Sequence, residues 1–183
     1  MYTELRKKLL TKRNKISSIK QQSASKQITQ KILSSKIFKQ SKNIAFYLAT
    51  AGEIDTWELI TKALAAKKHC FLPVVEGKQL YFIHYLEGDL LYKNKWHILE
   101  PQHDQAKLIV PEKLDLVIVP LVGFNGNNFR LGMGKGYYDR TFAFKLIQPN
   151  CRPYLLGVAY SWQKVDFIPQ SWDVPVQEII TNN

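Results

Sequence analysis

The sequence predicts an α/β protein with a single, mainly parallel sheet layered by helices and a pair of basic helices at its N-terminus. Three observations lead to this fold class. Short runs of apolar and β-branched residues alternate with segments in which apolar residues recur at helical spacing. A glycine-rich connection at 130–139 joins one such run to a helical segment, which is typical of α/β sheets. The first 42 residues are strongly basic, whereas the rest of the chain is neutral.

The N-terminal segment carries the whole net charge of +11. Residues 1–42 hold twelve of the 26 Lys and Arg residues and one of the 15 Asp and Glu residues, which leaves fourteen of each sign in 43–183. Helical spacing of apolar residues indicates two basic amphipathic helices. The apolar positions are Leu5, Leu9, Leu10, Ile28, Ile32 and Leu33, and the candidate helix caps are Ser17, Ser18 and Ser23. We expect this segment to pack on a core of 43–183, giving one domain over 1–183.

The core segment predicts strands that alternate with helices. Apolar, β-branched and aromatic runs indicate strands, the Glu76-Gly77 pair indicates a turn, and polar stretches without periodicity indicate loops. The expected elements are a strand at 43–48, a loop at 50–55, a helix at 56–66, strands at 70–75 and 80–85, an irregular surface loop at 87–111 that includes Trp96, a strand at 114–120, a helix at 137–146, a strand at 154–159 and a tail that ends in 176–181.

The decapeptide 130–139, Arg-Leu-Gly-Met-Gly-Lys-Gly-Tyr-Tyr-Asp, is the most informative stretch. Glycines lack a Cβ, so the backbone can adopt positive φ and point N–H groups at an oxyanion, and two cations add charge. The spacing differs from dinucleotide-binding and Walker patterns, since a glycine follows the lysine. On spacing alone, a tight turn between strand and helix is the alternative. The buried run at 114–120 before it and the helical segment after it favour an anion site, because helix N–H groups converge there.

Several acidic residues could hold ligands near this edge of the sheet. Asp139 falls in the first turn of the helix, where it either compensates the helix dipole or holds a magnesium ion that a nucleotide brings. Asp173 precedes Val174-Pro175, and is either a turn residue or a second metal ligand.

A second polar group surrounds Gly52 at the exit of the first strand. Thr50, Glu53 and Asp55 lie on the same carboxyl edge as the glycine loop if both strands run parallel, and acids there could accept hydrogen bonds from amino and ring N–H groups of a ligand. The alternative is that Asp55 or Thr56 caps the following helix.

The composition argues against several other classes. Cys70 and Cys151 lie far apart without a Cys-x-x-Cys pattern, which disfavours a disulfide framework and structural zinc. No apolar stretch approaches the ~20 residues of a membrane span, and the charged N-terminus lacks a signal-peptide core, so we expect a cytoplasmic protein. Motifs for a serine or zinc hydrolase are absent, so chemistry would come from positioning and charge.

Taken in order, these residues resemble the 5-formyltetrahydrofolate cyclo-ligase family, also called methenyltetrahydrofolate synthetases, over nearly the whole chain. The decapeptide is the most specific part of the resemblance. The other parts are Leu5-Arg6, Tyr47-Leu48, Gly52-Glu53-Ile54-Asp55-Thr56, Glu100-Pro101, Val119-Pro120, Phe124, Ile168-Pro169, Asp173 and Ile179-Ile180-Thr181.

The resemblance implies an enzyme that uses ATP and Mg²⁺ to cyclise 5-formyltetrahydrofolate to 5,10-methenyltetrahydrofolate, releasing ADP and phosphate. It implies that the formyl oxygen attacks the γ-phosphate, that N10 of the folate attacks the phosphorylated intermediate, and that phosphate then leaves. The expected partner is a reduced folate, with or without a polyglutamate tail. We expect a monomer without a specific nucleic-acid or membrane partner.

The resemblance also assigns site residues by position. The expected ATP contacts are Arg6, Arg130, Leu131, Gly132, Met133, Gly134, Lys135, Gly136, Tyr137 and Tyr138. The expected folate contacts are Thr50, Glu53, Asp55, Met133, Gly134, Lys135, Gly136 and Tyr137. Asp139 and Asp173 would hold magnesium, and Arg130, Lys135 and Tyr137 would be the catalytic residues.

The chain departs from the family pattern at three positions. Tyr2 stands where the family commonly has a lysine that contacts ATP, Asn125 stands for a frequent aspartate, and Asn128 for a usual glycine. Because asparagine tolerates left-handed φ, we expect the turn at Asn128 to survive.

Two alternative functions remain open from the sequence. The first is a relative that keeps the ATP site but acts on a different acceptor. The second is a nucleic-acid-associated module driven by the basic N-terminus, which predicts salt-dependent binding that is lost on deletion of 1–42.

Overall fold

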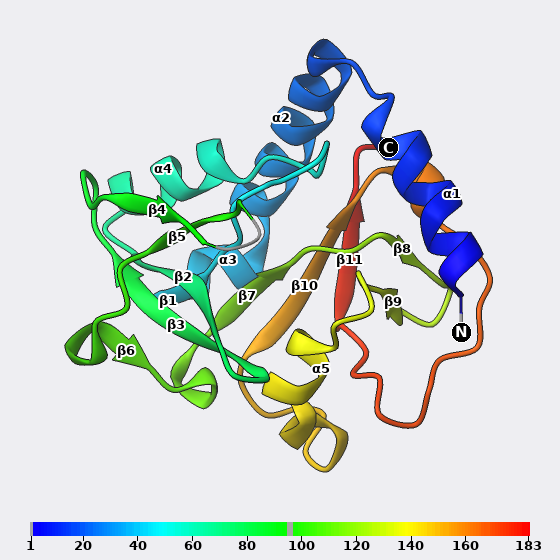
Figure 1. The fold of residues 1–183 in the computed structure, drawn as a ribbon. Coiled ribbons are helices and arrows are strands. Elements are labelled where there is room, and N and C mark those ends of the chain that lie inside the picture. Colours follow the sequence, from blue (N-terminus) through cyan, green and yellow to red (C-terminus); the bar gives the residue numbers. More distant parts are fainter. Residues whose placement is uncertain (1, 95–96) are drawn as a thin grey trace.

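A computed structural model describes residues 2–94 and 97–183, so Trp96 of the expected 87–111 loop lies outside the described residues. Within them, the centre is a seven-stranded sheet in the order β11-β10-β7-β1-β2-β3-β6 (Figure 1). Its strands are β1 (Asn43–Ala45), β2 (His69–Glu76), β3 (Gln79–Tyr85), β6 (Leu108–Ile109), β7 (Leu116–Val119), β10 (Tyr154–Ala159) and β11 (Glu178–Thr181). Each neighbouring pair from β11 to β2 is parallel. Strand β3 pairs antiparallel with β2, and β6 pairs antiparallel with β3. The mainly parallel α/β fold is thus confirmed.

Helices cover both faces of this sheet. They are α1 (Thr3–Asn14), α2 (Ser18–Ser34), α3 (Lys36–Gln40), α4 (Trp57–Ala65) and α5 (Tyr137–Thr141), with 3₁₀ turns η1 (Gln105–Lys107), η2 (Pro111–Lys113), η3 (Ala143–Leu146) and η4 (Ser161–Gln163). Apolar residues of α2, α3 and α4 share one buried cluster with Ile44 of β1. Phe142, which follows α5, packs with Ala45 in the cluster on the opposite face. Successive residues of β1 therefore serve opposite faces of the sheet.

Strand β7 shows most clearly why this sequence forms a central strand. All four of its residues are buried. Leu116 and Ile118 pack in the cluster with α2 and α4, whereas Val117 and Val119 pack in the cluster with Phe142. Burial on both faces requires a continuous apolar run, which confirms the prediction made for 114–120.

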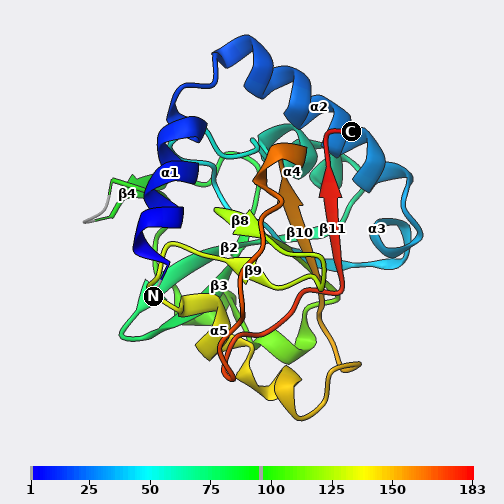
Figure 2. The same cartoon turned by 90° about the vertical axis from the view of Figure 1, so that its right-hand side faces the viewer.

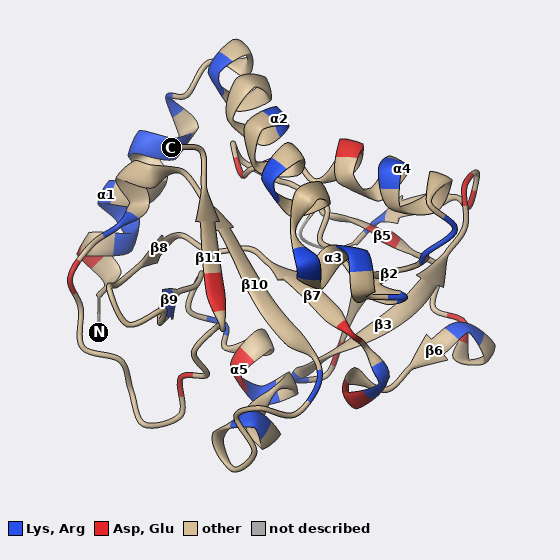
Figure 3. Cartoon of the chain, turned by 180° about the vertical axis from the view of Figure 1, so that it is seen from behind, with Lys and Arg blue, Asp and Glu red and all other residues tan. Residues whose placement is uncertain are grey.

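The basic N-terminal segment folds into α1 and α2 as predicted, followed by the short α3. Ser17 Oγ accepts a hydrogen bond from the backbone N–H of Lys20 at 3.4 Å and caps α2, whereas Ser23 lies inside that helix. Leu9, Ile28 and Ile32 are buried, as their spacing indicated. Figure 2 shows α1 beside the small sheet of β8 (Gly123–Phe124) and β9 (Arg130–Leu131). Lys and Arg are spread over α1, α2 and α3 (Figure 3).

Several elements differ from the sequence-based expectation. The prediction of an irregular loop at 87–111 is wrong for much of its length: β4 (Leu91–Lys93) pairs with β5 (Leu99–Pro101), and β6 extends the main sheet. The first strand ends at Ala45, and the helix expected at 137–146 is divided into α5 and η3. Strands of two or three residues are too short to show periodicity, which is why the sequence did not indicate them.

None of the helices described in 2–94 and 97–183 combines the length and apolar character needed to cross a membrane. Cys70 and Cys151 are both free thiols, and burial raises the pKa of Cys70 to about 12.

Candidate active site

The candidate site lies where the order of strands reverses. From β1 the chain continues to β2 on one side, while β7 lies on the other side of β1. Pairing of Ile44 with Leu116 and of Ala45 with Val117 is parallel, so both strands end at the same edge, as the sequence analysis required. The loops that leave such a pair diverge and open a crevice for ligands in α/β sheets.

The glycine loop reaches this edge by a less direct route than expected. It follows β9 instead of the buried strand β7, because the β8–β9 hairpin intervenes, with Gly123 opposite Leu131 and Phe124 opposite Arg130. Gly134 and Gly136 have φ of 87° and 66°, so two of the three glycines adopt the positive φ expected of them. Gly132 does not.

Arg6 of α1 lies across this loop. Its Nε donates a hydrogen bond to the carbonyl oxygen of Gly132 at 2.8 Å. A Cβ on Gly134 would lie 3.7 Å from Arg6 Cζ, so the guanidinium rests directly against the loop. Met133, Gly134 and Lys135 are exposed. An anion at the loop would therefore meet open backbone, the Lys135 ammonium and a guanidinium that α1 holds in place.

Arg130 lies beneath the loop, buried and paired. Its Nη2 lies 2.6 Å from Asp139 Oδ1, and its Nη1 donates to the carbonyl oxygen of Val174 at 2.5 Å. Asp139 Oδ1 also accepts from the Val174 N–H at 3.1 Å. The guanidinium lies 5.7 Å from the Tyr138 ring centroid. Arg130 and Asp139 thus join the start of α5 to the segment that contains Asp173.

Asp173 and Asp139 are consequently neighbours through Val174. Asp173 Oδ2 accepts a hydrogen bond from the Gln170 N–H at 2.8 Å, so the turn role considered for it is present. Among residues 2–94 and 97–183, no three His, Cys, Asp or Glu side chains gather as a ready-made metal site. Two carboxylates beside a glycine loop fit a magnesium ion that arrives with a nucleotide, because Mg²⁺ is commonly held by one or two carboxylates plus phosphates.

Glu53 and Asp55, which follow β1, have different surroundings. Glu53 Oε2 accepts a hydrogen bond from the Thr50 N–H at 3.0 Å, and its Oε1 lies 3.4 Å from Arg13 Nη1. Asp55 is exposed, and its Oδ1 accepts from the Trp57 N–H at 2.9 Å at the start of α4. The helix-start role considered for Asp55 is therefore present. Thr56 donates its hydroxyl hydrogen to the carbonyl oxygen of Tyr47 and does not cap α4.

The charge of Glu53 affects the pKa of tyrosines near the glycine loop as well as in its own surroundings. Burial raises the pKa of Glu53, against the lowering effect of Arg13. Burial also raises the pKa of Tyr138 on α5, and the negative charge of Glu53 adds to that effect. The same two causes act on Tyr47, which follows β1. The negative charge of Glu53 thus acts on tyrosines that follow both β1 and β9.

A family model described as the 5-formyltetrahydrofolate cyclo-ligase family matches residues 2–182. The chain belongs to the 5-formyltetrahydrofolate cyclo-ligase family. Among curated members, the cyclo-ligase of Haemophilus influenzae is 34% identical over 189 residues, covering 98% of this chain and 99% of that protein. That of Mycoplasma pneumoniae is 30% identical, with 97% and 96% covered.

Solved structures agree with this membership. The structure of Aquifex aeolicus 5,10-methenyltetrahydrofolate synthetase has a TM-score of 0.84 at 34% identity, covering 100% of this chain and 90% of that one. A synthetase from Mycoplasma pneumoniae gives a TM-score of 0.77 at 30% identity, with 98% of each chain covered. The cyclo-ligase resemblance inferred from the sequence is confirmed, and the chain is an enzyme of folate one-carbon metabolism that converts 5-formyltetrahydrofolate to 5,10-methenyltetrahydrofolate.

The departures from the usual cyclo-ligase pattern have clear structural roles. The Tyr2 hydroxyl donates to the Ile168 carbonyl oxygen at 3.2 Å and accepts from the Ile168 N–H at 3.0 Å, which holds the 167–168 segment against α1. Asn128 has φ of 60°, so the expected left-handed turn survives. Asn125 Oδ1 accepts from the N–H groups of Asn127 and Phe129 and closes the β8–β9 turn.

Arg13 was not among the expected site residues, although its side chain contacts Ala51, Glu53 and Leu121 in the loops after β1 and β7. Arg13 follows Arg6 by seven residues, so both lie on one face of α1. That spacing from a recognised site residue was the available signal.

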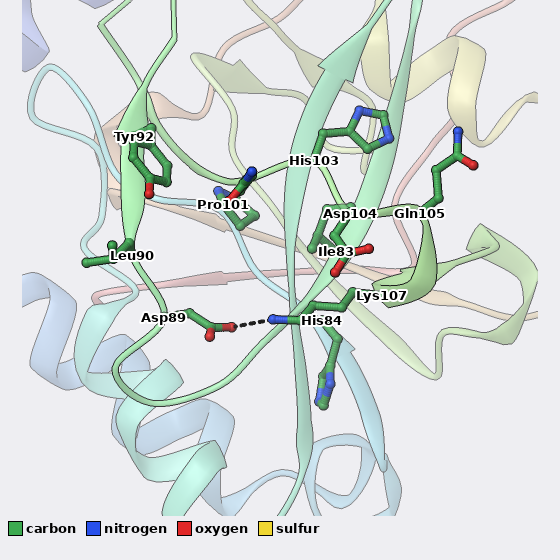
Figure 4. A pocket seen from close by; sticks show the side chains of 11 residues that line it. Ile83, His84, Asp89, Leu90, Tyr92, Pro101, His103, Asp104, Gln105 and Lys107 are labelled. Carbon is green, nitrogen blue, oxygen red and sulfur yellow. Dashed lines mark hydrogen bonds and ion pairs between the residues drawn. The ribbon is translucent and has the colours of Figure 1, made fainter.

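A separate cavity of about 490 Å³ lies between β3, η1 and the β4–β5 hairpin (Figure 4). None of the expected site residues lines it. Its charged groups are engaged with protein neighbours, since Lys107 Nζ lies 3.4 Å from Asp89 Oδ2 and His103 Nδ1 lies 3.6 Å from Glu76 Oε2. The β1–β7 edge is therefore the candidate site.

Proposed function

We propose that this cyclo-ligase couples ATP hydrolysis to the closure of 5-formyltetrahydrofolate, with Mg²⁺ as the required metal ion. The observation that carries the proposal is that one helix, α1, contacts both a glycine loop, through Arg6, and the carboxylate Glu53 on the loop after β1, through Arg13. The first group suits a polyphosphate and the second suits the N–H groups of a pterin.

The proposed reaction needs no nucleophile from the protein. The formyl oxygen attacks the γ-phosphorus of ATP, the bond to the bridging oxygen breaks and ADP leaves. N10 of the folate then attacks the activated formyl carbon and loses its proton to solvent, and the carbon–oxygen bond breaks as phosphate departs. The enzyme must align two substrates and neutralise phosphate charge, which is how phosphoryl transfer is generally accelerated.

The cations at the loop divide these tasks. Lys135 is exposed and Arg6 lies against Gly134, so both can meet phosphate oxygens. Arg130 is already balanced by Asp139, and we propose that it acts on ATP chiefly by fixing the loop and the start of α5. The Arg140 guanidinium lies 5.3 Å from the Tyr137 ring centroid and orients this ring beside the loop.

Asp139 and Asp173 would hold the magnesium ion. Each uses one carboxylate oxygen in the hydrogen bonds described above, and the other oxygen would be the metal ligand. Bound there, the ion would neutralise phosphate charge. On the folate side we propose Glu53 as the main acceptor for pterin N–H groups, with Thr50 beside it and Asp55 farther out.

The test is direct. Purified protein is mixed with 5-formyltetrahydrofolate, ATP and Mg²⁺, and methenyl product is followed by near-ultraviolet absorbance, with ATP and Mg²⁺ omitted in turn. We expect product only in the complete mixture, and Lys135→Met to lower kcat/KM at least about tenfold, as expected for loss of one charged contact. Lys62→Met on the exposed face of α4 is the matched control. ATP turnover without methenyl product would instead favour a different acceptor.

A further inference from the structure

We propose that Arg13 is a positioning residue, which orients the Glu53 carboxylate toward the folate by tying together the loops that follow β1 and β7. This inference rests on the function proposed above and extends it to a residue outside the expected ligand contacts. It concerns the last turn of α1, on the opposite end of the helix from Tyr2.

The contacts of Arg13 span both loops. Its Nε donates to the carbonyl oxygen of Ala51 at 3.0 Å, and its Nη1 donates to that of Leu121 at 3.4 Å. The same Nη1 lies 3.4 Å from Glu53 Oε1. Arg13 is 2% exposed. A buried guanidinium thus joins the carboxyl ends of the two strands that flank the crevice, and a planar group with several donors suits this task better than an ammonium.

The backbone around Glu53 is built for this close approach. Gly52 has φ of 74°, and a Cβ there would lie 2.9 Å from the carbonyl oxygen of Arg13. The Tyr160 hydroxyl donates to the Gly52 carbonyl oxygen at 3.0 Å, and Gln21 Nε2 donates to that of Glu53 at 2.7 Å. Besides the Arg13 contact to Ala51, two other side chains thus hold the main chain of this loop, so removing the Arg13 side chain should alter the Glu53 carboxylate more than it alters the loop.

The groups around Glu53 affect its pKa, which can be measured. The groups that face it are Arg13 from α1, Thr50 from its own loop, Tyr47 after β1, Tyr138 from α5 and Tyr160 after β10. Burial raises the pKa of Glu53, and Arg13 is the cation that opposes this. Only the ionised carboxylate accepts N–H donors with both oxygens, so loss of Arg13 should protonate Glu53 at a higher pH and weaken its hold on the pterin.

The experiment compares Arg13→Gln with wild type over pH 5–9, with KM measured separately for folate and ATP. We expect the acid limb of kcat/KM to move up by about one pH unit or more and the folate KM to rise about tenfold, while the ATP KM stays near wild type. Arg13→Lys should recover part of both effects. Arg152→Gln is the matched control, because Arg152 forms a 2.8 Å ion pair with Asp115 but is 73% exposed.

Two further measurements test the same role of Arg13. Glu53→Gln, which keeps Arg13, should abolish the acid limb that wild type shows, and a wild-type pH profile and folate KM in this variant would overturn the proposal even if Arg13→Gln does not fold. NMR titration of the Glu53 carboxyl in wild type and Arg13→Gln needs no turnover. An unchanged Glu53 pKa with unchanged folate KM overturns the role of Arg13, whereas failure of wild type to form methenyl product overturns the proposed function alone.

Discussion

Charged residues of the candidate site are paired with one another before any ligand binds. Arg130 with Asp139 and Arg13 with Glu53 are largely buried ion pairs that also bond to backbone groups of neighbouring loops. Because removing one member leaves a buried charge without its partner, substitutions here should affect both stability and activity. Charged residues with a purely ligand-binding role should affect activity alone.

Asp139, which is paired with Arg130, and Asp173, which is not, allow effects on stability to be distinguished from effects on metal binding. Asp139→Asn should lower the free energy of unfolding by about 3 kcal/mol, because Arg130 remains buried, and should also impair the use of Mg²⁺. Asp173→Asn keeps an oxygen for the Gln170 N–H, so its stability should change by less than about 1 kcal/mol. Its Mg²⁺ requirement should nevertheless rise. Denaturant unfolding measures the change in stability, and the rate of methenyl formation at increasing Mg²⁺ concentration measures the metal requirement. A wild-type Mg²⁺ response in Asp173→Asn would contradict the assignment.

Individual residues were predictable where backbone chemistry decides the outcome. The positive φ of Gly134, Gly136 and Asn128 follows from residue type and local pattern. The burial of Arg130 and the role of Arg13 depend on contacts with residues 44 and 38 positions away, respectively, and local sequence carries no signal for these distances. The pairing of Arg130 with Asp139, nine positions along the chain, was not among the expected contacts of either residue.

At the level of elements, helix α1 is the part that organises the crevice. One face of it holds the 167–168 segment through Tyr2, the glycine loop through Arg6 and the loop after β1 through Arg13. Leu9, between these polar contacts, packs with Val122 and Leu131 against the β8–β9 hairpin. The apolar contact sets the position of the helix, and therefore the positions of both arginines.

Shortening Leu9 tests this role of α1. Leu9 is 5% exposed, so Leu9→Ala should cost about 2–5 kcal/mol of unfolding free energy. Because α1 carries Arg6, the KM for ATP should rise as well. Ile19→Ala is the matched control, since Ile19 is 77% exposed and its shortening should change stability by less than about 0.5 kcal/mol. Denaturant unfolding and ATP kinetics provide the readouts. Loss of stability with an unchanged ATP KM would show that α1 does not position the loop.

The elements that bury several apolar residues in a regular pattern were the ones predicted well from the sequence. Strands β2, β3, β7 and β10 and helix α4 match their expected ranges closely, because each buries several residues in a regular pattern. The β4–β5 and β8–β9 pairs contain two or three residues a strand and are defined by backbone hydrogen bonds. Such pairs form because the chain is brought back on itself by tertiary contacts, which sequence periodicity does not express.

At the scale of the whole molecule, strand order creates the site. The sequence indicated parallel strands, but it did not indicate that β7 would insert beside β1 and so place the loops after β1 and β7 at one edge. The contacts made by the basic residues of the first 42 positions are likewise visible only in the folded structure. Arg6 and Arg13 point inward to this edge, and Lys31 Nζ donates to the Thr181 carbonyl oxygen at 2.9 Å. Part of that charge therefore serves packing and the site.

Hydrogen exchange with and without Mg²⁺ and a non-hydrolysable ATP analogue tests the central claim that the glycine loop at the β1–β7 edge is the ATP site. We expect protection in 131–139 and 170–174, with the exchange of 83–92 and 101–107 unchanged. Protection confined to 83–92 and 101–107, which line the cavity beside β3, would contradict the account and move the ATP site to that cavity.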